Sequence, residues 1–285
     1  MLGKLFKYDM RALSKVLLPV HGAVLAVGLL GVLAAFVGYT LDDMALKSTS
    51  VEVTIGMMTA VMAAVMLFSL LAMIIAAGAT LVVIIHRFYK NLFTDEGYLT
   101  LTLPASANQV VLAKLLAGLL WSLIDLAVVC LLSCMVSWAA YGMMTVNFED
   151  TLPYWLLSVQ GSGSLLGGGG GGSALLGIVN MLIQLVSTLC LVYVSFALGA
   201  VVAKVHRVAA GIGLYCLLAW GVSLLGTIGT IVVTVLFTSF GNYEYEMASA
   251  AHMASTVLGW VLHLCLAAVS YVVCVRLIER KLDLP

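Results

Sequence analysis

The stretch VTIGMMTAVMAAVMLFSLLAMIIAAGATLVVIIH, residues 53–86, contains no charged residue. A transmembrane helix needs about 20 mostly apolar residues, so this stretch is long enough to cross a bilayer. The whole chain is 63% hydrophobic and 9% charged, with a mean hydropathy of +1.16, whereas soluble domains carry roughly 25% charged residues. These numbers predict an all-α integral membrane protein. We expect one transmembrane domain over residues 1–285.

The hydropathy pattern predicts six membrane spans. Their approximate ranges are 17–40, 56–86, 112–141, 174–203, 208–238 and 253–275. If both termini are cytoplasmic, every basic residue except Lys47 falls on the cytoplasmic side, as the positive-inside rule requires. The cytoplasmic set is Lys4, Lys7, Arg11, Lys15, Arg87, Lys90, Lys114, Lys204, Arg207, Arg276, Arg280 and Lys281.

The same rule assigns residues 151–203 a single crossing, because a second one would place Lys204 and Arg207 outside. Residues 142–173 then form an external loop. Its segment GSGSLLGGGGGGS, residues 161–173, is glycine-rich and is predicted to be flexible. It is not followed by the G-K-[ST] sequence of a phosphate-binding loop.

The first 16 residues place apolar side chains at helical spacing, with most basic side chains on other faces. This pattern predicts an amphipathic helix, residues 1–16, lying on the cytoplasmic membrane surface. The alternative is that these residues are the polar start of the first span.

Asp125 and His263 lie well inside predicted spans. Asp125 follows Lys114 by about 11 residues, or roughly 16 Å of helix, which places it near the bilayer midplane. A carboxylate at that depth costs at least ~2.5 kcal/mol on insertion scales, so such groups are functional candidates. We hypothesise that Asp125 and His263 meet or line one polar cavity. The alternative is a packing role, with Asp125 protonated or bonded to a hydroxyl such as Ser122.

Other residues have structural interpretations. His21, His86 and His206 lie near predicted interfaces and are expected to be solvated. The six cysteines lie in apolar segments without metal-ligand spacing, so we expect buried thiols and no metal site. Glycines in the first and fifth spans predict close helix contacts. They are Gly28, Gly31, Gly211, Gly213, Gly221, Gly226 and Gly229.

Residues 87–111 form an unusually polar cytoplasmic loop between spans two and three. Ser106 and Gln109 have the S-x-x-Q spacing of a capping box, so the third helix is predicted to begin near residue 107. Upstream, YLTLTL, residues 98–103, alternates polar and apolar side chains, which suits a strand or a short interfacial helix. A simple connector needs only about 2 to 8 residues.

The opening MLGKLFKYDMRAL, the segment YKNLFTDEGYLTLTLP and the six-span hydropathy resemble the permease subunits of type-2 ATP-binding-cassette exporters, particularly the small six-span permeases of Gram-positive bacteria. The resemblance implies that residues 91–105 dock on a separate ATPase subunit. It also implies a second permease copy or a related permease, and a location in the plasma membrane. The docking residues would be Asp95, Glu96, Gly97, Tyr98, Leu99 and Pro104.

No hydrolytic or nucleotide-binding motif occurs in the chain, so we expect no catalytic residue and no cofactor here, with ATP and Mg bound by the partner. The zero net charge argues against a nucleic-acid partner. Two alternatives remain at this stage. One is an ion-coupled secondary transporter that uses Asp125 and His263, which usually shows an internal repeat. The other is a membrane scaffold that transports nothing.

Overall fold

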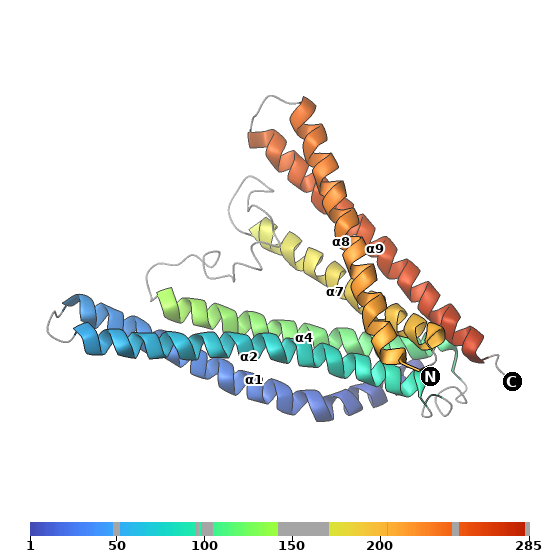
Figure 1. Cartoon of the computed structure of the whole chain (residues 1–285), viewed down its shortest axis with the longest axis horizontal. Helices are drawn as coiled ribbons and strands as arrows, with labels where there is room; N and C mark the ends of the chain where they lie inside the picture. Colours follow the sequence, from blue (N-terminus) through green and yellow to red (C-terminus); the bar gives the residue numbers. More distant parts are fainter. Residues whose placement is uncertain are drawn as a thin grey trace. The chain divides into compact units, whose positions relative to one another are not determined.

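The computed structural model describes residues 1–47, 52–94, 97, 105–141, 171–203, 205–240 and 245–282. These residues are almost entirely helical and contain no strand (Figure 1). The helices are α1 (Leu2–Lys47), α2 (Glu52–Phe93), α4 (Ala107–Tyr141), α7 (Gly171–Val202), α8 (Arg207–Phe240) and α9 (Tyr245–Leu282).

Each helix contains one predicted span and is long and apolar enough to cross a membrane. The all-α fold of the described residues, with six helices that could span a membrane, is therefore confirmed, and the chain is a multi-pass membrane protein. The glycine-rich loop ends slightly earlier than predicted, because α7 already begins at Gly171. Residues 142–170 lie outside the described ranges.

Helix α1 is continuous from Leu2 to Lys47 and has 46 residues. At 1.5 Å per residue it is roughly 69 Å long, about twice the thickness of the hydrocarbon core. The amphipathic segment 1–16 is thus the first part of the helix that contains the first span. Its orientation along the membrane surface stays a prediction.

The structure divides into two compact units, which we describe separately. Unit 2 contains Arg11–Val83 and Leu120–Leu156, and its described parts of α1, α2 and α4 lie side by side (Figure 1). Its core joins one residue of α1 to residues of the other two helices, namely Val24, Met73, Ala76 and Leu132.

Two glycines of α1 allow this close packing in unit 2. A side chain at position 28 would overlap Leu132 of α4, and one at position 31 would overlap Ser69 of α2. The predicted helix contacts at Gly28 and Gly31 are therefore confirmed. Small residues serve this purpose in lipid because association there depends on close packing rather than on the hydrophobic effect.

Unit 1 contains Met1–Met10, Ile84–Leu119 and Leu157–Pro285. Helix α7 packs against both α8 and α9. In the most apolar 18-residue stretch of α7, 67% of the residues are buried. In the corresponding stretch of α8, no residue is buried. Gly199 meets Gly211 where α7 contacts α8, since a Cβ at 199 would lie 2.5 Å from the Gly211 nitrogen.

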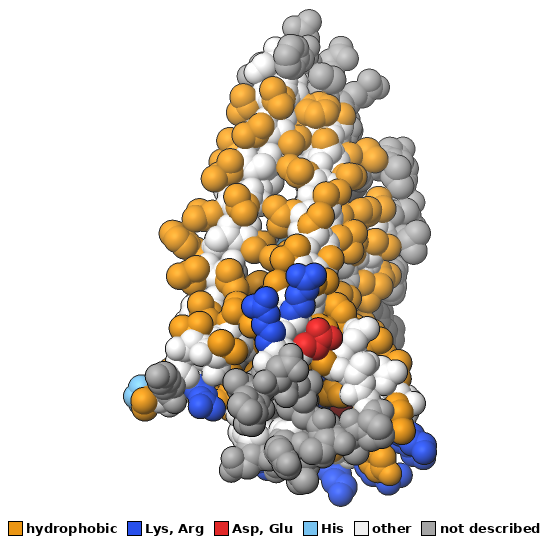
Figure 2. Space-filling model, turned by 90° about the vertical axis from the view of Figure 1, so that its right-hand side faces the viewer, with side chains coloured by type: hydrophobic (Ala, Val, Ile, Leu, Met, Phe, Trp, Pro, Cys, Tyr) orange, Lys and Arg blue, Asp and Glu red, His pale blue; other side chains and the backbone are white. Residues whose placement is uncertain are grey.

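Of the other α8 glycines that were predicted to make helix contacts, only some do so. A side chain at Gly229 would meet Leu258 of α9, whereas Gly213, Gly221 and Gly226 face open space among the described residues. The face shown in Figure 2 is hydrophobic over most of the helix length, and its Lys and Arg side chains gather toward one end. This pattern suits a membrane-spanning bundle.

Candidate functional site

The turn after α2 belongs to the predicted docking loop, of which Gly97 is described. Its N–H donates a hydrogen bond to the Thr94 carbonyl at 2.8 Å. A Cβ at this position would lie 2.7 Å from the Leu92 carbonyl oxygen, so only glycine fits without a shift of the backbone. The other predicted docking residues lie outside the described ranges: Asp95, Glu96, Tyr98, Leu99 and Pro104. The docking role stays a prediction.

The far end of the loop is fixed by the predicted helix cap. Helix α4 begins at Ala107, and the Gln109 N–H donates to Ser106 Oγ at 3.3 Å. The Val110 N–H donates to the Ser106 carbonyl at 3.1 Å. Ser106 therefore satisfies an N–H group at the helix start, as its spacing to Gln109 predicted.

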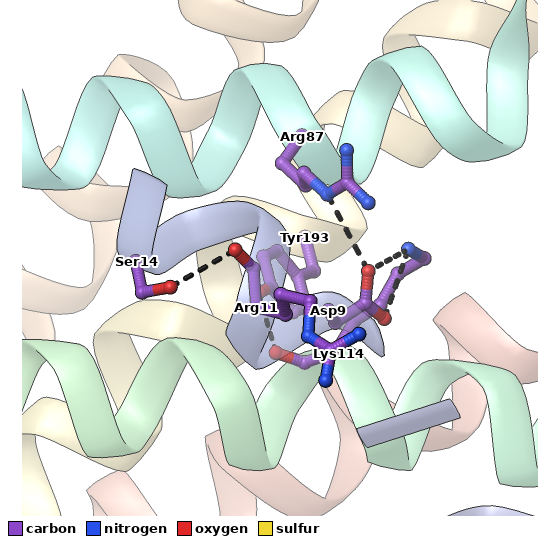
Figure 3. Close-up of polar contacts among 6 residues, drawn as sticks. All are labelled: Asp9, Arg11, Ser14, Arg87, Lys114 and Tyr193. Atoms are coloured by element: carbon purple, nitrogen blue, oxygen red, sulfur yellow. Dashed lines mark hydrogen bonds and ion pairs between the residues drawn. The ribbon is translucent and has the colours of Figure 1, made fainter. Parts of the chain in front are cut away.

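A cluster of three charged side chains, two of which are buried, lies close to both ends of this loop, and its contacts are drawn in Figure 3. Lys114 Nζ lies 3.2 and 3.3 Å from the two carboxylate oxygens of Asp9, and Arg87 Nε lies 3.5 Å from Asp9 Oδ1. Asp9 is 8% exposed and Lys114 is 5% exposed. We call these three residues the Asp9 cluster. One carboxylate of α1 thus holds a cation of α2 and a cation of α4.

The two cations of the Asp9 cluster lie close to the helix ends that flank the loop. Arg87 precedes the end of α2 at Phe93 by two turns or less, and Lys114 follows the start of α4 at Ala107 by about the same distance. At 1.5 Å per residue both lie within about 11 Å of the loop. Asp9 therefore ties together the two helix ends from which the loop projects.

Tyr193 of α7 joins this corner to the rest of unit 1. Its ring stacks on Phe88 of α2, with centroids 4.0 Å apart and planes within 2°. Its hydroxyl donates to the Lys114 carbonyl at 3.2 Å. Gly118 makes room for this contact, because a Cβ there would lie 2.9 Å from the Tyr193 hydroxyl oxygen. The α2 and α4 ends are thus packed on α7.

The Asp9 cluster was missed by sequence reasoning, which assigned Arg87 and Lys114 to the cytoplasmic side and named no partner for either. The structure adds that Lys114 is buried against Asp9. A signal was present, because Asp9 follows Leu5 by four residues and precedes Leu13 by four. It therefore lies on the apolar stripe of its helix, where a carboxylate needs a partner.

A second buried polar group lies in unit 2 around Asp125. Its Oδ1 lies 3.4 Å from His21 Nε2 of α1 and 3.4 Å from the Thr80 hydroxyl of α2. His21 also contacts the ring of Trp121, with centroids 5.5 Å apart. The partner hydroxyl is Thr80 from another helix rather than Ser122. His21 is 6% exposed, so the expectation of a solvated histidine is wrong.

His263 has a different environment, in unit 1. Its Nδ1 lies 3.1 Å from the hydroxyl oxygen of Ser187 on α7. Both residues line a groove of about 550 Å³ formed by α7, α8 and α9. Asp125 and His263 thus belong to different units and have separate partners, and their meeting stays a prediction. The remaining polar side chains of the groove are uncharged: Gln184, Thr188, Tyr215, Ser223, Thr227 and Thr230.

Comparison with protein-family models, curated proteins and solved structures gives no match for this chain.

Proposed function

We propose that the chain is the transmembrane permease subunit of an ATP-binding-cassette exporter, with the energy supplied by a separate ATPase. The observation that carries this proposal is the Asp9 cluster, which braces the two helix ends beside the polar loop. A loop that only connects two spans needs no such brace. A loop that a partner pushes needs such a brace, because a loosely held loop would bend instead of moving the helices.

The contacts of unit 1 provide a route by which such a force could spread. Movement of the loop displaces the ends of α2 and α4 together, since Asp9 holds both. The Phe88 and Lys114 contacts of Tyr193 carry the displacement to α7. Helix α7 is packed against α8 and α9, with which it forms the groove. Movement of the loop would therefore change the shape of the groove.

The remaining features of the proposal follow from the charge pattern and the family resemblance. Both termini and the loop face the cytoplasm, and the protein lies in the plasma membrane of a Gram-positive bacterium. Residues 1–16 bring Asp9 from the cytoplasmic end of α1 to the loop corner. Two permease copies, or two related permeases, assemble with two ATPase subunits, which bind ATP and Mg.

In this mechanism the chain performs no covalent chemistry. ATP binding closes the ATPase pair, and the docked loops move with it. The permease halves then alternate between inward-facing and outward-facing states. Conformational steps of this kind require a packed element with discrete arrangements rather than a soft linker. The corner built on Asp9 and Tyr193 is packed rather than soft, which supports this part of the proposal.

Co-purification of this chain with an ATP-binding-cassette ATPase subunit from the same organism tests the proposal. We expect the wild-type pair to form a complex and the double variant Asp95→Arg/Glu96→Arg to lose it, because both substitutions reverse the loop charge. The matched control is Asp42→Arg/Asp43→Arg, an acidic pair on the opposite predicted side, which should retain the complex. A wild-type chain that binds no ATPase would refute the permease assignment. A complex unaffected by the loop variant would refute only the docking residues.

A further inference from the structure

His21 has a defined tautomer in this structure. Its Nδ1 lies 2.8 Å from the Leu17 carbonyl oxygen, four residues earlier in α1. A carbonyl oxygen can only accept, so Nδ1 must carry a hydrogen. In a neutral imidazole the other nitrogen, Nε2, then has a bare lone pair.

That bare nitrogen lies beside an acid, without a hydrogen-bond partner of its own among the described residues. His21 Nε2 lies 3.4 Å from Asp125 Oδ1, and the two side chains are 8% and 12% exposed. If His21 is neutral and Asp125 is ionised, two lone pairs face each other and the pair has a buried charge of −1. One additional proton, on Nε2 or on Oδ1, removes both the contact between two lone pairs and the buried negative charge. In either case the pair is electrically neutral.

Among the described residues, no charged group other than His21 is found to act on Asp125. From α2, Thr80 faces it with a hydroxyl that also lies 3.1 Å from the Ala76 carbonyl. From α4, Trp121 is buried, and its Nε1 has no hydrogen-bond partner among the described residues. From α1, His21 is the electrostatic partner of Asp125. Neutrality therefore depends on the shared proton.

We propose that His21 and Asp125 together form a proton-binding site in the membrane-spanning part of unit 2, and that the bound proton latches α1 to α4. The proton comes from water and returns to water, and no other bond forms or breaks. The inference does not depend on the proposed export function. It rests on the Leu17 contact, the facing atoms and the burial.

The latch follows from electrostatics in a low-dielectric environment. With the proton bound, Nε2 and Oδ1 attract each other through a hydrogen bond or an ion pair. Without it, an uncompensated carboxylate remains in the membrane interior, where intramembrane charges are costly. The carboxylate must then gain water, which requires α1 and α4 to separate at this point.

The protonation state of the wild-type chain in lipid nanodiscs is the direct test. We expect ¹⁵N resonances and the infrared carboxyl band at neutral pH to show one of two patterns. These are a doubly protonated His21 with an ionised Asp125, or a singly protonated His21 with a carboxylic acid. A singly protonated His21 together with an ionised Asp125 at neutral pH would overturn the site. Bands are assigned with Asp125→Asn and His21→Gln.

A double-mutant cycle tests the latch. Its variants are His21→Leu, Asp125→Leu and the pair of both, compared by their unfolding equilibria in detergent. We expect the wild-type pair to be coupled by about tenfold at neutral pH. The coupling should disappear at the alkaline pH where the spectra show loss of the proton. Coupling that is absent at neutral pH, or that persists after the proton has left, would refute the latch.

Discussion

The Asp9 cluster and the His21–Asp125 pair are both buried acid sites, but they balance charge differently. In unit 1 one carboxylate faces two bases that are normally cationic, Arg87 and Lys114. In unit 2 one carboxylate faces a single histidine, which is neutral or charged depending on a proton. The first arrangement keeps a positive excess when all its groups are ionised. The second is neutral only while it holds its proton.

The difference matches the location of the two sites along their helices. The Asp9 cluster lies within about two turns of the polar loop, and its Arg87 side chain is 35% exposed, so water can screen an excess charge there. Asp125 follows Lys114 by about 16 Å of helix, deeper in the span. The site with two facing bases therefore lies near the loop, and the deeper site uses the side chain whose charge a single proton can change.

The Asp9→Asn substitution should give the largest effect of the changes compared here. It leaves the Lys114 ammonium buried without its counter-charge, and removing one partner of a buried ion pair typically costs about 3–5 kcal/mol. Thermal unfolding in detergent should shift strongly downward. Lys7→Ala removes an exposed charge from the same helix and is the control, with little expected change. An unchanged unfolding temperature for Asp9→Asn would show that the cluster is not a brace.

The His21→Leu substitution should destabilise the protein less than Asp9→Asn does. The pair of variants therefore tests the difference between the two sites. Asp125 can then take its own proton and become a neutral acid, and it keeps the Thr80 hydroxyl as a partner. An incompletely bonded buried group costs about 1–3 kcal/mol. His86→Leu, at an exposed position of α2, is the matched control. If His21→Leu were as damaging as Asp9→Asn, the two sites would not differ in the way described.

The Ser106→Ala substitution should have the smallest effect and act on one end of α4 only. Loss of an N-cap costs about 1 kcal/mol. Hydrogen exchange should increase around Lys114 and remain unchanged around Asp125, because fraying is confined to the first turns. Ser106→Asp can accept the same N–H and should restore protection. Equal exchange along the whole helix would contradict a local cap.

The general outline of the fold could be predicted from sequence because it depends on local properties. Six apolar runs are long enough to span a bilayer, and the S-x-x-Q spacing at Ser106 fixed the start of α4 within one residue. Gly28 and Gly31 indicated close packing correctly, although nothing in sequence indicated that Ser69 and Leu132 would be their neighbours.

The polar partners could not be predicted, because they are far apart in the chain. Asp9 and Lys114 are separated by 105 residues, and no local rule relates them. His21 appeared to lie at an interface because it is close to a basic segment. Its burial arises from α1 continuing as one helix from Leu2, which places residues 9 and 21 against other helices.

The sequence by itself determined that the chain crosses the membrane, how many crossings the apolar runs provide and where the loop helix begins. These properties follow from hydrophobic length and from hydrogen bonds between residues close in sequence. Only the tertiary structure decided which buried charges are neutralised and by what. The sequence showed that Asp125 is an acidic residue deep inside a predicted span. Its partner His21 became apparent only from the packing of α1 against α4. In a low-dielectric environment that pairing determines where a proton is held.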